Sequence, residues 1–206
     1  MACRPSSARR YRLTALDVGT RISVRVQVRA AGHAWTTAHS APTGRVDYAT
    51  PVRRRVTYSV TTRGRIVASV RDFAHLAQET YDDARGWRAG GVQFRRVPRG
   101  GHFTLVLSEA RLVPSFSPTC STTWSCRVGR YVIINQDRWK NASPAWNRAR
   151  RSLRDYRHLV VNHETGHWLG RGHAGCPGSG PAPVMMQQSK GTGGCSFNPW
   201  PLPWER

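Results

Sequence analysis

Hydrophobic and polar residues alternate near the start of the chain. Between residues 21 and 28, arginine or another polar residue alternates with isoleucine or valine, which predicts a half-exposed strand. No such pattern occurs in residues 1–20, and residues 30–50 are rich in Ala, Thr, Gly and Pro. We therefore expect residues 1–50 to form a basic, loosely ordered segment with one possible strand.

From residue 51 onward the pattern predicts a domain of strands and helices that continues to residue 206. Apolar residues recur at helical spacing between Val67 and Arg85, which predicts a helix there. Short apolar runs bounded by turn-forming residues predict strands at 56–60, 92–97, 103–108 and 130–135. This order indicates an α+β fold, close to the α/β type, in a single domain at 51–206.

A second long helix is predicted to begin after Ser152, because serine is a preferred N-cap residue. Apolar residues such as Leu153 and Leu159 recur along one side of it, so it should be buried on that side. Gly170 can adopt the positive φ that ends a helix. After Gly170 we expect little regular structure.

The second predicted helix contains the string HETGHWLGRGH, which begins at His163. It matches H-E-x-x-H-x-x-G-x-x-H, and a chance match in this chain has a probability on the order of 10⁻⁵. His163 and His167 are four residues apart, so their side chains lie on one face of a helix and can share a cation. A turn at Gly170 would then bring His173 to the same ion, while Glu164 would lie beside it.

Three imidazoles leave one tetrahedral position open, which is typical of a catalytic zinc site. We therefore expect one Zn²⁺ per chain, bound by His163, His167 and His173. Glu164 would act as general base toward a zinc-bound water and then as general acid. The resulting hypothesis is a zinc-dependent endopeptidase. The alternative is a catalytically degenerate, zinc-containing binding module that uses its basic surface to bind polyanions.

Residues on both sides of this string match a known pattern. Y-R-H and V-V-N precede it, C-P-G follows it, and P-A-P-V-M-M-Q-Q begins at Pro181. With these residues the chain resembles the metzincin clan of zinc metallopeptidases. It is most similar to an uncharacterised family of secreted bacterial metzincin-like domains. The resemblance covers roughly residues 50–204 and is strongest from Arg130 onward.

The resemblance implies a mixed, twisted sheet with a long zinc-binding helix, followed by an irregular C-terminal part with a methionine turn beneath the zinc. It implies Met185 as the turn methionine, with Met186 as the less favoured candidate. It also implies an antiparallel edge strand that holds an extended peptide, which we expect between Ser108 and Trp124. Some metzincins place a tyrosine after the turn to assist the transition state, but no tyrosine follows Tyr156 here.

Five cysteines bear on the compartment in which the protein works. Cys120 and Cys126 bracket a short loop, and Cys176 and Cys195 bracket the methionine segment, so two local disulfides would leave Cys3 unpaired. The competing interpretation is four reduced thiols in a cytosolic protein. We favour disulfides and a secreted or cell-surface protein. No signal peptide is visible, so we expect a mature or truncated form.

The formal net charge is +21, and only two of the 32 basic residues are lysines. The charge is spread along the chain, which favours nonspecific attraction to anionic surfaces over specific nucleic-acid binding. No apolar run approaches eighteen residues, so no transmembrane segment is expected. We expect a monomer whose partner is a peptide or protein substrate.

Overall fold

The computed structural model describes residues 10–206, which fall into two compact units. The boundary lies between Ala49 and Thr50, one residue from the predicted position. In the first unit, a short 3-10 helix, η1 (Ala15–Asp17), precedes an antiparallel pair of strands, β1 (Arg25–Val28) and β2 (Thr36–His39). The first unit therefore contains a second strand that the sequence did not predict.

Two predictions about this first unit were wrong. Residues 36–39 form β2 instead of loop, because their threonines suit a strand and pair with β1 although they are not apolar. The strand predicted at 21–28 is shorter, and all of its residues are exposed instead of half of them. A hairpin with no buried face needs no alternation of apolar and polar residues, so hydrophobic periodicity predicts it poorly.

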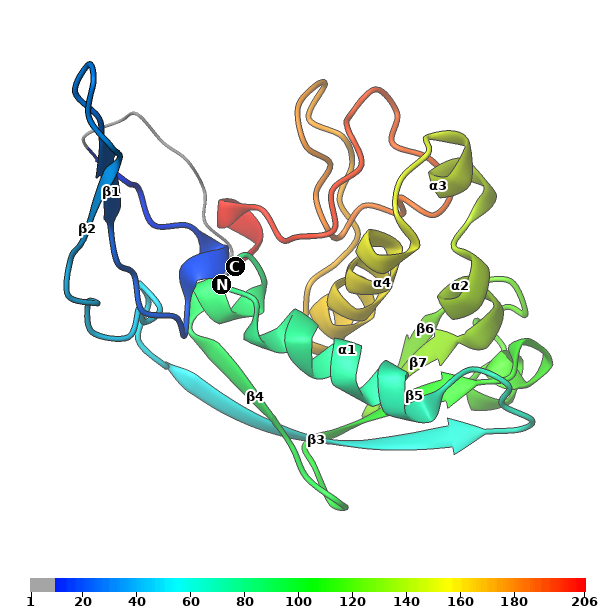
Figure 1. Cartoon of the computed structure of the whole chain (residues 1–206). Helices are drawn as coiled ribbons and strands as arrows, with labels where there is room; N and C mark the ends of the chain where they lie inside the picture. Colours follow the sequence, from blue (N-terminus) through cyan, green and yellow to red (C-terminus); the bar gives the residue numbers. More distant parts are fainter. Residues whose placement is uncertain (1–9) are drawn as a thin grey trace. The chain divides into compact units, whose positions relative to one another are not determined.

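The second unit is built on a five-stranded mixed sheet (Figure 1). The strands, in their order across the sheet, are β4 (Val92–Arg96), β3 (Arg54–Arg63), β5 (Phe103–Ser108), β7 (Tyr131–Asn135) and β6 (Cys126–Val128). The first four run parallel to one another, whereas β6 is antiparallel to β7. The predicted α+β class with a mixed sheet is confirmed at this level.

The α-helices cover one face of this sheet, whereas the 3-10 helix η3 (Ala110–Phe116) packs against the other face. The α-helices are α1 (Val70–Asp82), α2 (Gln136–Asn141), α3 (Pro144–Arg148) and α4 (Leu153–Trp168), and the other 3-10 helices of this unit are η2 (Trp87–Gly90) and η4 (Pro203–Glu205). Apolar residues of α1 and α4 pack with inward-facing residues of β3, β5 and β7 in the main core. A smaller cluster around Ile133 and Val113 lies on the opposite face.

Helix caps explain where the long helices begin. Ser152 Oγ accepts a hydrogen bond from the Asp155 amide at 3.0 Å, so α4 starts where its N-cap was predicted. Ser69 caps α1 in the same way, which makes α1 three residues shorter at its start than predicted. The sequence missed α2 and α3, because helices of five and six residues are too short to show a period.

The antiparallel edge strand exists, but its predicted position was wrong. It was expected between Ser108 and Trp124, whereas β6 begins only at Cys126. Most of the predicted stretch is η3 and the turn that follows it. The bond between Cys120 and Cys126 closes that turn, and the chain resumes a strand at the second cysteine.

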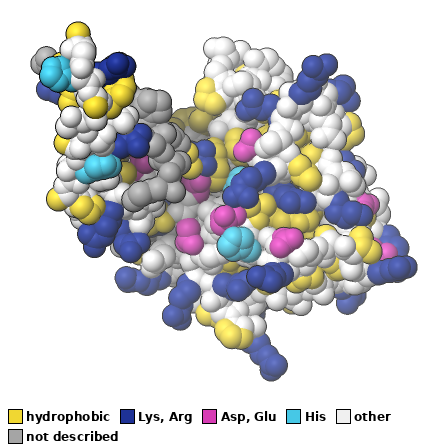
Figure 2. Space-filling model, viewed as in Figure 1, with side chains coloured by type: hydrophobic (Ala, Val, Ile, Leu, Met, Phe, Trp, Pro, Cys, Tyr) yellow, Lys and Arg dark blue, Asp and Glu magenta, His cyan; other side chains and the backbone are white. Residues whose placement is uncertain are grey.

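Both predicted disulfides are present. Cys120 is bonded to Cys126 and Cys176 to Cys195, each with a Cα–Cα distance of 5.8 Å. Cys3 lies outside the described residues. None of the helices described in residues 10–206 is both long and apolar enough to cross a membrane. Lys and Arg side chains are scattered over the face shown in Figure 2 and do not gather in one patch.

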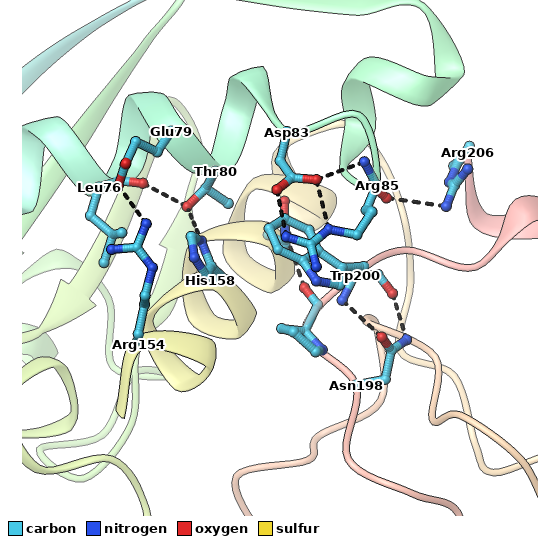
Figure 3. A network of polar contacts seen from close by, with 12 residues as sticks. Leu76, Glu79, Thr80, Asp83, Arg85, Arg154, His158, Asn198, Trp200 and Arg206 are labelled. Carbon is cyan, nitrogen blue, oxygen red and sulfur yellow. Dashed lines mark hydrogen bonds and ion pairs between the residues drawn. The ribbon is translucent and has the colours of Figure 1, made fainter. Parts of the chain in front are cut away.

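A polar network attaches the end of the chain to α1 and α4 (Figure 3). The His158 ring lies 4.8 Å from the Trp200 ring, and the Arg85 guanidinium lies 4.3 Å from the same indole. Arg206 donates to the backbone carbonyl of Arg85 at 3.1 Å. The C-terminal segment is therefore fixed against both long helices, and it contributes to the site described next.

Candidate metal centre

Three histidines meet at the C-terminal end of α4. His163 and His167 lie on one face of the helix, with ring centroids 4.7 Å apart. Gly170 has a φ of 90°, a value that favours glycine, and the chain turns there to bring back His173. His167 Nε2 lies 3.2 Å from His163 Nε2 and 3.1 Å from His173 Nε2. The sequence-predicted ligands therefore come together, with the ligand atoms within 4.8 Å of one another.

Backbone carbonyls fix the tautomers of two of these rings. His163 Nδ1 lies 2.8 Å from the carbonyl oxygen of Val184, and His167 Nδ1 lies 2.9 Å from that of Arg171. A carbonyl oxygen only accepts, so each Nδ1 donates its hydrogen and a neutral ring keeps a lone pair on Nε2. Two lone pairs then face each other across 3.2 Å, an arrangement that repels unless a cation lies between them.

Burial makes a proton an unfavourable choice for that cation. It lowers the pKa of His163 to about 3 and lowers the pKa of His167. A tetrahedral zinc site with Zn–N bonds of about 2.0–2.1 Å would hold its ligand nitrogens about 3.3 Å apart. The two Nε2 separations that involve His167 are close to that value, so the spacing of His167 from each of the other two rings suits a zinc-sized ion.

Glu164 lies next to the first histidine on α4 and is almost completely buried. Burial raises the pKa of this carboxyl to about 8, and the positive charge of Arg127 opposes that rise. A carboxyl with a pKa close to neutrality can both accept and release a proton at neutral pH. The environment of Glu164 therefore suits an acid–base role.

Met185 packs directly beneath the turn of α4 that contains His163 and His167. Its side chain is buried, and a Cβ added at Gly166 would collide with the Met185 sulfur and come within 2.8 Å of the Trp87 ring. The carbonyl of Met185 accepts from the Ala174 amide at 3.2 Å, next to the third histidine. Of the two methionines considered, Met185 therefore occupies the position beneath the histidines. Met186 is half-buried and lines a pocket beside His173.

The comparisons with known proteins give one match. Residues 53–194 match the model of a family described as "Protein of unknown function (DUF3152)". The chain belongs to this family. No curated protein and no solved structure matches the chain. The DUF3152 match includes the three histidines, Glu164 and Met185, and it ends one residue before Cys195.

The DUF3152 match also stops short of a residue that the sequence analysis missed. Glu205, buried in η4, accepts hydrogen bonds from the amides of Val184 at 3.0 Å, Met185 at 2.9 Å and Leu202 at 2.7 Å. It thereby holds the turn that bonds His163. The only signal available in the sequence was an acidic residue near the end of a strongly basic chain.

Two amide side chains complete the support of this turn in the DUF3152 chain. Gln188 is 1 % exposed and donates to the carbonyls of Pro183 at 2.9 Å and Asn198 at 2.7 Å. The backbone N–H of Asn198 donates to Gln188 Oε1 at 2.9 Å, and the side-chain Nδ2 of Asn198 donates to the carbonyl of Ala182. The methionine segment is therefore held by side chains and does not depend on regular secondary structure.

Proposed function

We propose that this protein is a zinc-dependent endopeptidase of the metzincin type. The observation that carries the proposal is the pair of imidazole Nε2 atoms that face each other across 3.2 Å with their hydrogens committed elsewhere. His163, His167 and His173 would bind the zinc through Nε2 and leave a position for water or substrate. The carbonyls of Val184 and Arg171 accept from Nδ1 of His163 and His167, and in metal sites such bonds orient the ligand rings.

Bound zinc would polarise the scissile carbonyl and make a water acidic enough to attack it near neutral pH. Glu164 would take the proton of the attacking water and then pass it to the leaving amine. Its burial supports this role, because it brings the pKa of the carboxyl close to the working pH. The bond between Met185 and the Ala174 amide would keep the third ligand in place during the reaction.

The free edge of the sheet supports a peptide as the substrate. β6 is the last strand on one side of the sheet, and it packs alongside α4. An extended peptide could add a strand to this edge through main-chain hydrogen bonds and so lie across the metal centre. An antiparallel edge strand of this kind is what the metzincin resemblance implies. Two disulfides favour an oxidising compartment, so we propose a secreted or cell-surface enzyme.

Metal content and hydrolysis, measured together, test this function. Purified protein should contain one zinc per chain and cleave members of a quenched fluorescent peptide library. Glu164→Gln should retain the zinc, because the histidines are unchanged, and should lose at least about 100-fold in kcat, the usual contribution of a general base. His75→Gln, an exposed histidine on α1, is the matched control and should leave both unchanged.

Each other outcome has a distinct meaning. Zinc without cleavage by the wild-type protein would favour a binding module, whose affinity for polyanions should fall steeply with salt. Cleavage that survives Glu164→Gln would reject the proposed general base. Absence of zinc from protein refolded with the metal would reject the metal centre itself.

A further inference from the structure

The sheet edge beside the metal centre carries an arginine to which the proposed mechanism assigns no role. Arg127 is the central residue of β6, and its side chain is exposed. It forms no hydrogen bond or ion pair with any residue between 10 and 206. A guanidinium presents five donors in a planar fork that matches a carboxylate. Arg127 is therefore available to a ligand.

The strand register decides on which face of the sheet Arg127 lies. It stands opposite Val132 in the antiparallel ladder, and directly opposed residues project their side chains to the same face. Val132 is fully buried in the main core, between the sheet and the long helices. Cys126 and Val128, the neighbours of Arg127, pack instead with the cluster on the opposite face. Arg127 therefore points to the face that carries α4 and its histidines.

The backbone gives the same result. β6 packs alongside α4, the helix that carries His163 and His167, so the side of the sheet to which Arg127 points is the side of the histidines.

A peptide that adds a strand to the outer edge of β6 would place one of its side chains opposite Arg127 and on the same face. We propose that Arg127 is a specificity-determining residue that binds an aspartate or glutamate of the substrate beside the metal centre. This inference rests on the proposed peptidase function and narrows its substrates to acidic peptides. At a partly exposed site, a good Arg–carboxylate pair should change affinity by roughly three- to tenfold.

Binding of peptide hydroxamates to the zinc-loaded protein tests the inference without hydrolysis. A fluorescent peptide of about ten residues, the length of a long strand, would carry a C-terminal hydroxamate to ligate zinc and fix the register. A single aspartate is moved along the peptide, and each Kd is compared with that of the asparagine version at physiological salt. One position should prefer aspartate by roughly three- to tenfold, and Arg127→Gln should abolish that preference.

Matched variants separate the local effect from the general positive charge. Arg95→Gln removes the same charge from an exposed position on β4, at the opposite edge of the sheet, and should leave the preference unchanged. Arg127→Glu should reverse it, so that lysine is preferred over glutamine at the same position. Unchanged circular dichroism and zinc content would show that these variants are folded.

The inference is overturned if no position prefers aspartate, if the preference persists in Arg127→Gln, or if no hydroxamate peptide binds at the zinc. Failure of the proposed function looks different, because it appears in the hydrolysis assay. Cleavage of peptides without an acidic preference would remove the role of Arg127 and leave the peptidase. Tight binding of acidic hydroxamates without any cleavage would keep the role of Arg127 and remove the peptidase.

Discussion

Helix α4 carries a buried histidine, His158, and two half-buried ones, His163 and His167. The two kinds differ in the group that faces the second nitrogen of the ring. The Thr80 hydroxyl donates to the Leu76 carbonyl at 2.7 Å, so His158 must donate its Nδ1 hydrogen to Thr80 Oγ1 at 2.8 Å. Its ring then packs against Trp200. His163 and His167 also donate through Nδ1, but their Nε2 atoms face each other.

The difference separates a packing residue from a ligand more reliably than burial does. Both His158 and His163 have pKa values lowered chiefly by burial, so both are neutral over the ordinary pH range. Only His163 has its acceptor nitrogen, Nε2, placed against the acceptor nitrogen of another ring, that of His167. Such a pair would be stabilised by a cation in the space between the two nitrogens.

The largest effect on stability should come from removing zinc, and it should involve His163 and His167 but not His158. At a zinc concentration of about a thousand times Kd, binding should stabilise the wild-type protein by about 4 kcal/mol, and a chelator should remove that increment. His167→Ala should lose most of the increment, since a lost ligand weakens the site severely. Thermal unfolding with and without zinc measures both.

His158→Asn is the matched variant for this experiment. Asparagine can still donate to Thr80, so the variant should be less stable than the wild-type protein in both conditions but keep the whole zinc increment. An increment that survives in His167→Ala, or that disappears in His158→Asn, would contradict the distinction between the two kinds of histidine.

Features that depend on residues close along the chain could be predicted from the sequence, whereas features that depend on long-range contacts could not. The histidines, both disulfides and the cap of α4 depend on residues that are close along the chain, and all of them were found. The role of Glu205 depends on contacts with Val184 and Met185, some twenty residues earlier, and no local pattern marks it.

The position of β6 was missed for a related reason. A three-residue strand has almost no periodicity, and its place is set by pairing with β7 and by the Cys120–Cys126 bond. The significance of Arg127 likewise depends on register, because a shift of one residue would turn its side chain to the other face. The sequence could therefore predict that the three histidines come together, but not the sheet edge beside them.

The pH dependence of the free energy of unfolding should reveal the buried His158, with an effect of intermediate size. Burial, together with the positive charges of Arg154 and Arg85, lowers the pKa of His158 to about 4, and the carboxylates of Asp83 and Asp155 oppose this shift. Below pH 6.5 the unfolded chain binds a proton at this residue that the folded chain does not. The free energy of unfolding should therefore fall as the pH drops from about 6.5 to about 4, by at most about 3 kcal/mol.

The measurement is denaturant unfolding of wild-type protein and His158→Asn at several pH values, with a chelator present throughout. The two proteins share every other residue, so the difference between them isolates His158. That difference should shrink as the pH falls from neutrality to 4, because only the wild-type protein has the penalty. A difference that stays constant with pH would show that His158 is not held neutral.

Gly166→Ala tests the packing beneath the ligands and should have the smallest effect. Alanine normally stabilises a helix interior by about 1 kcal/mol relative to glycine. Here the new methyl group would collide with Met185 and approach Trp87, so we expect a net loss of about 1–2 kcal/mol. Met185→Ala alone should also cost stability, but in combination the two changes should cost less than their sum, because the collision disappears. If Met185 supports the histidines, the losses of zinc affinity in the two single variants and the double variant should rank in the same order as their losses of stability. Additive losses in this double-mutant cycle would mean that Met185 is an ordinary core residue. The end of α4 that carries His163 and His167 would then be packed in the same way as the part that carries His158.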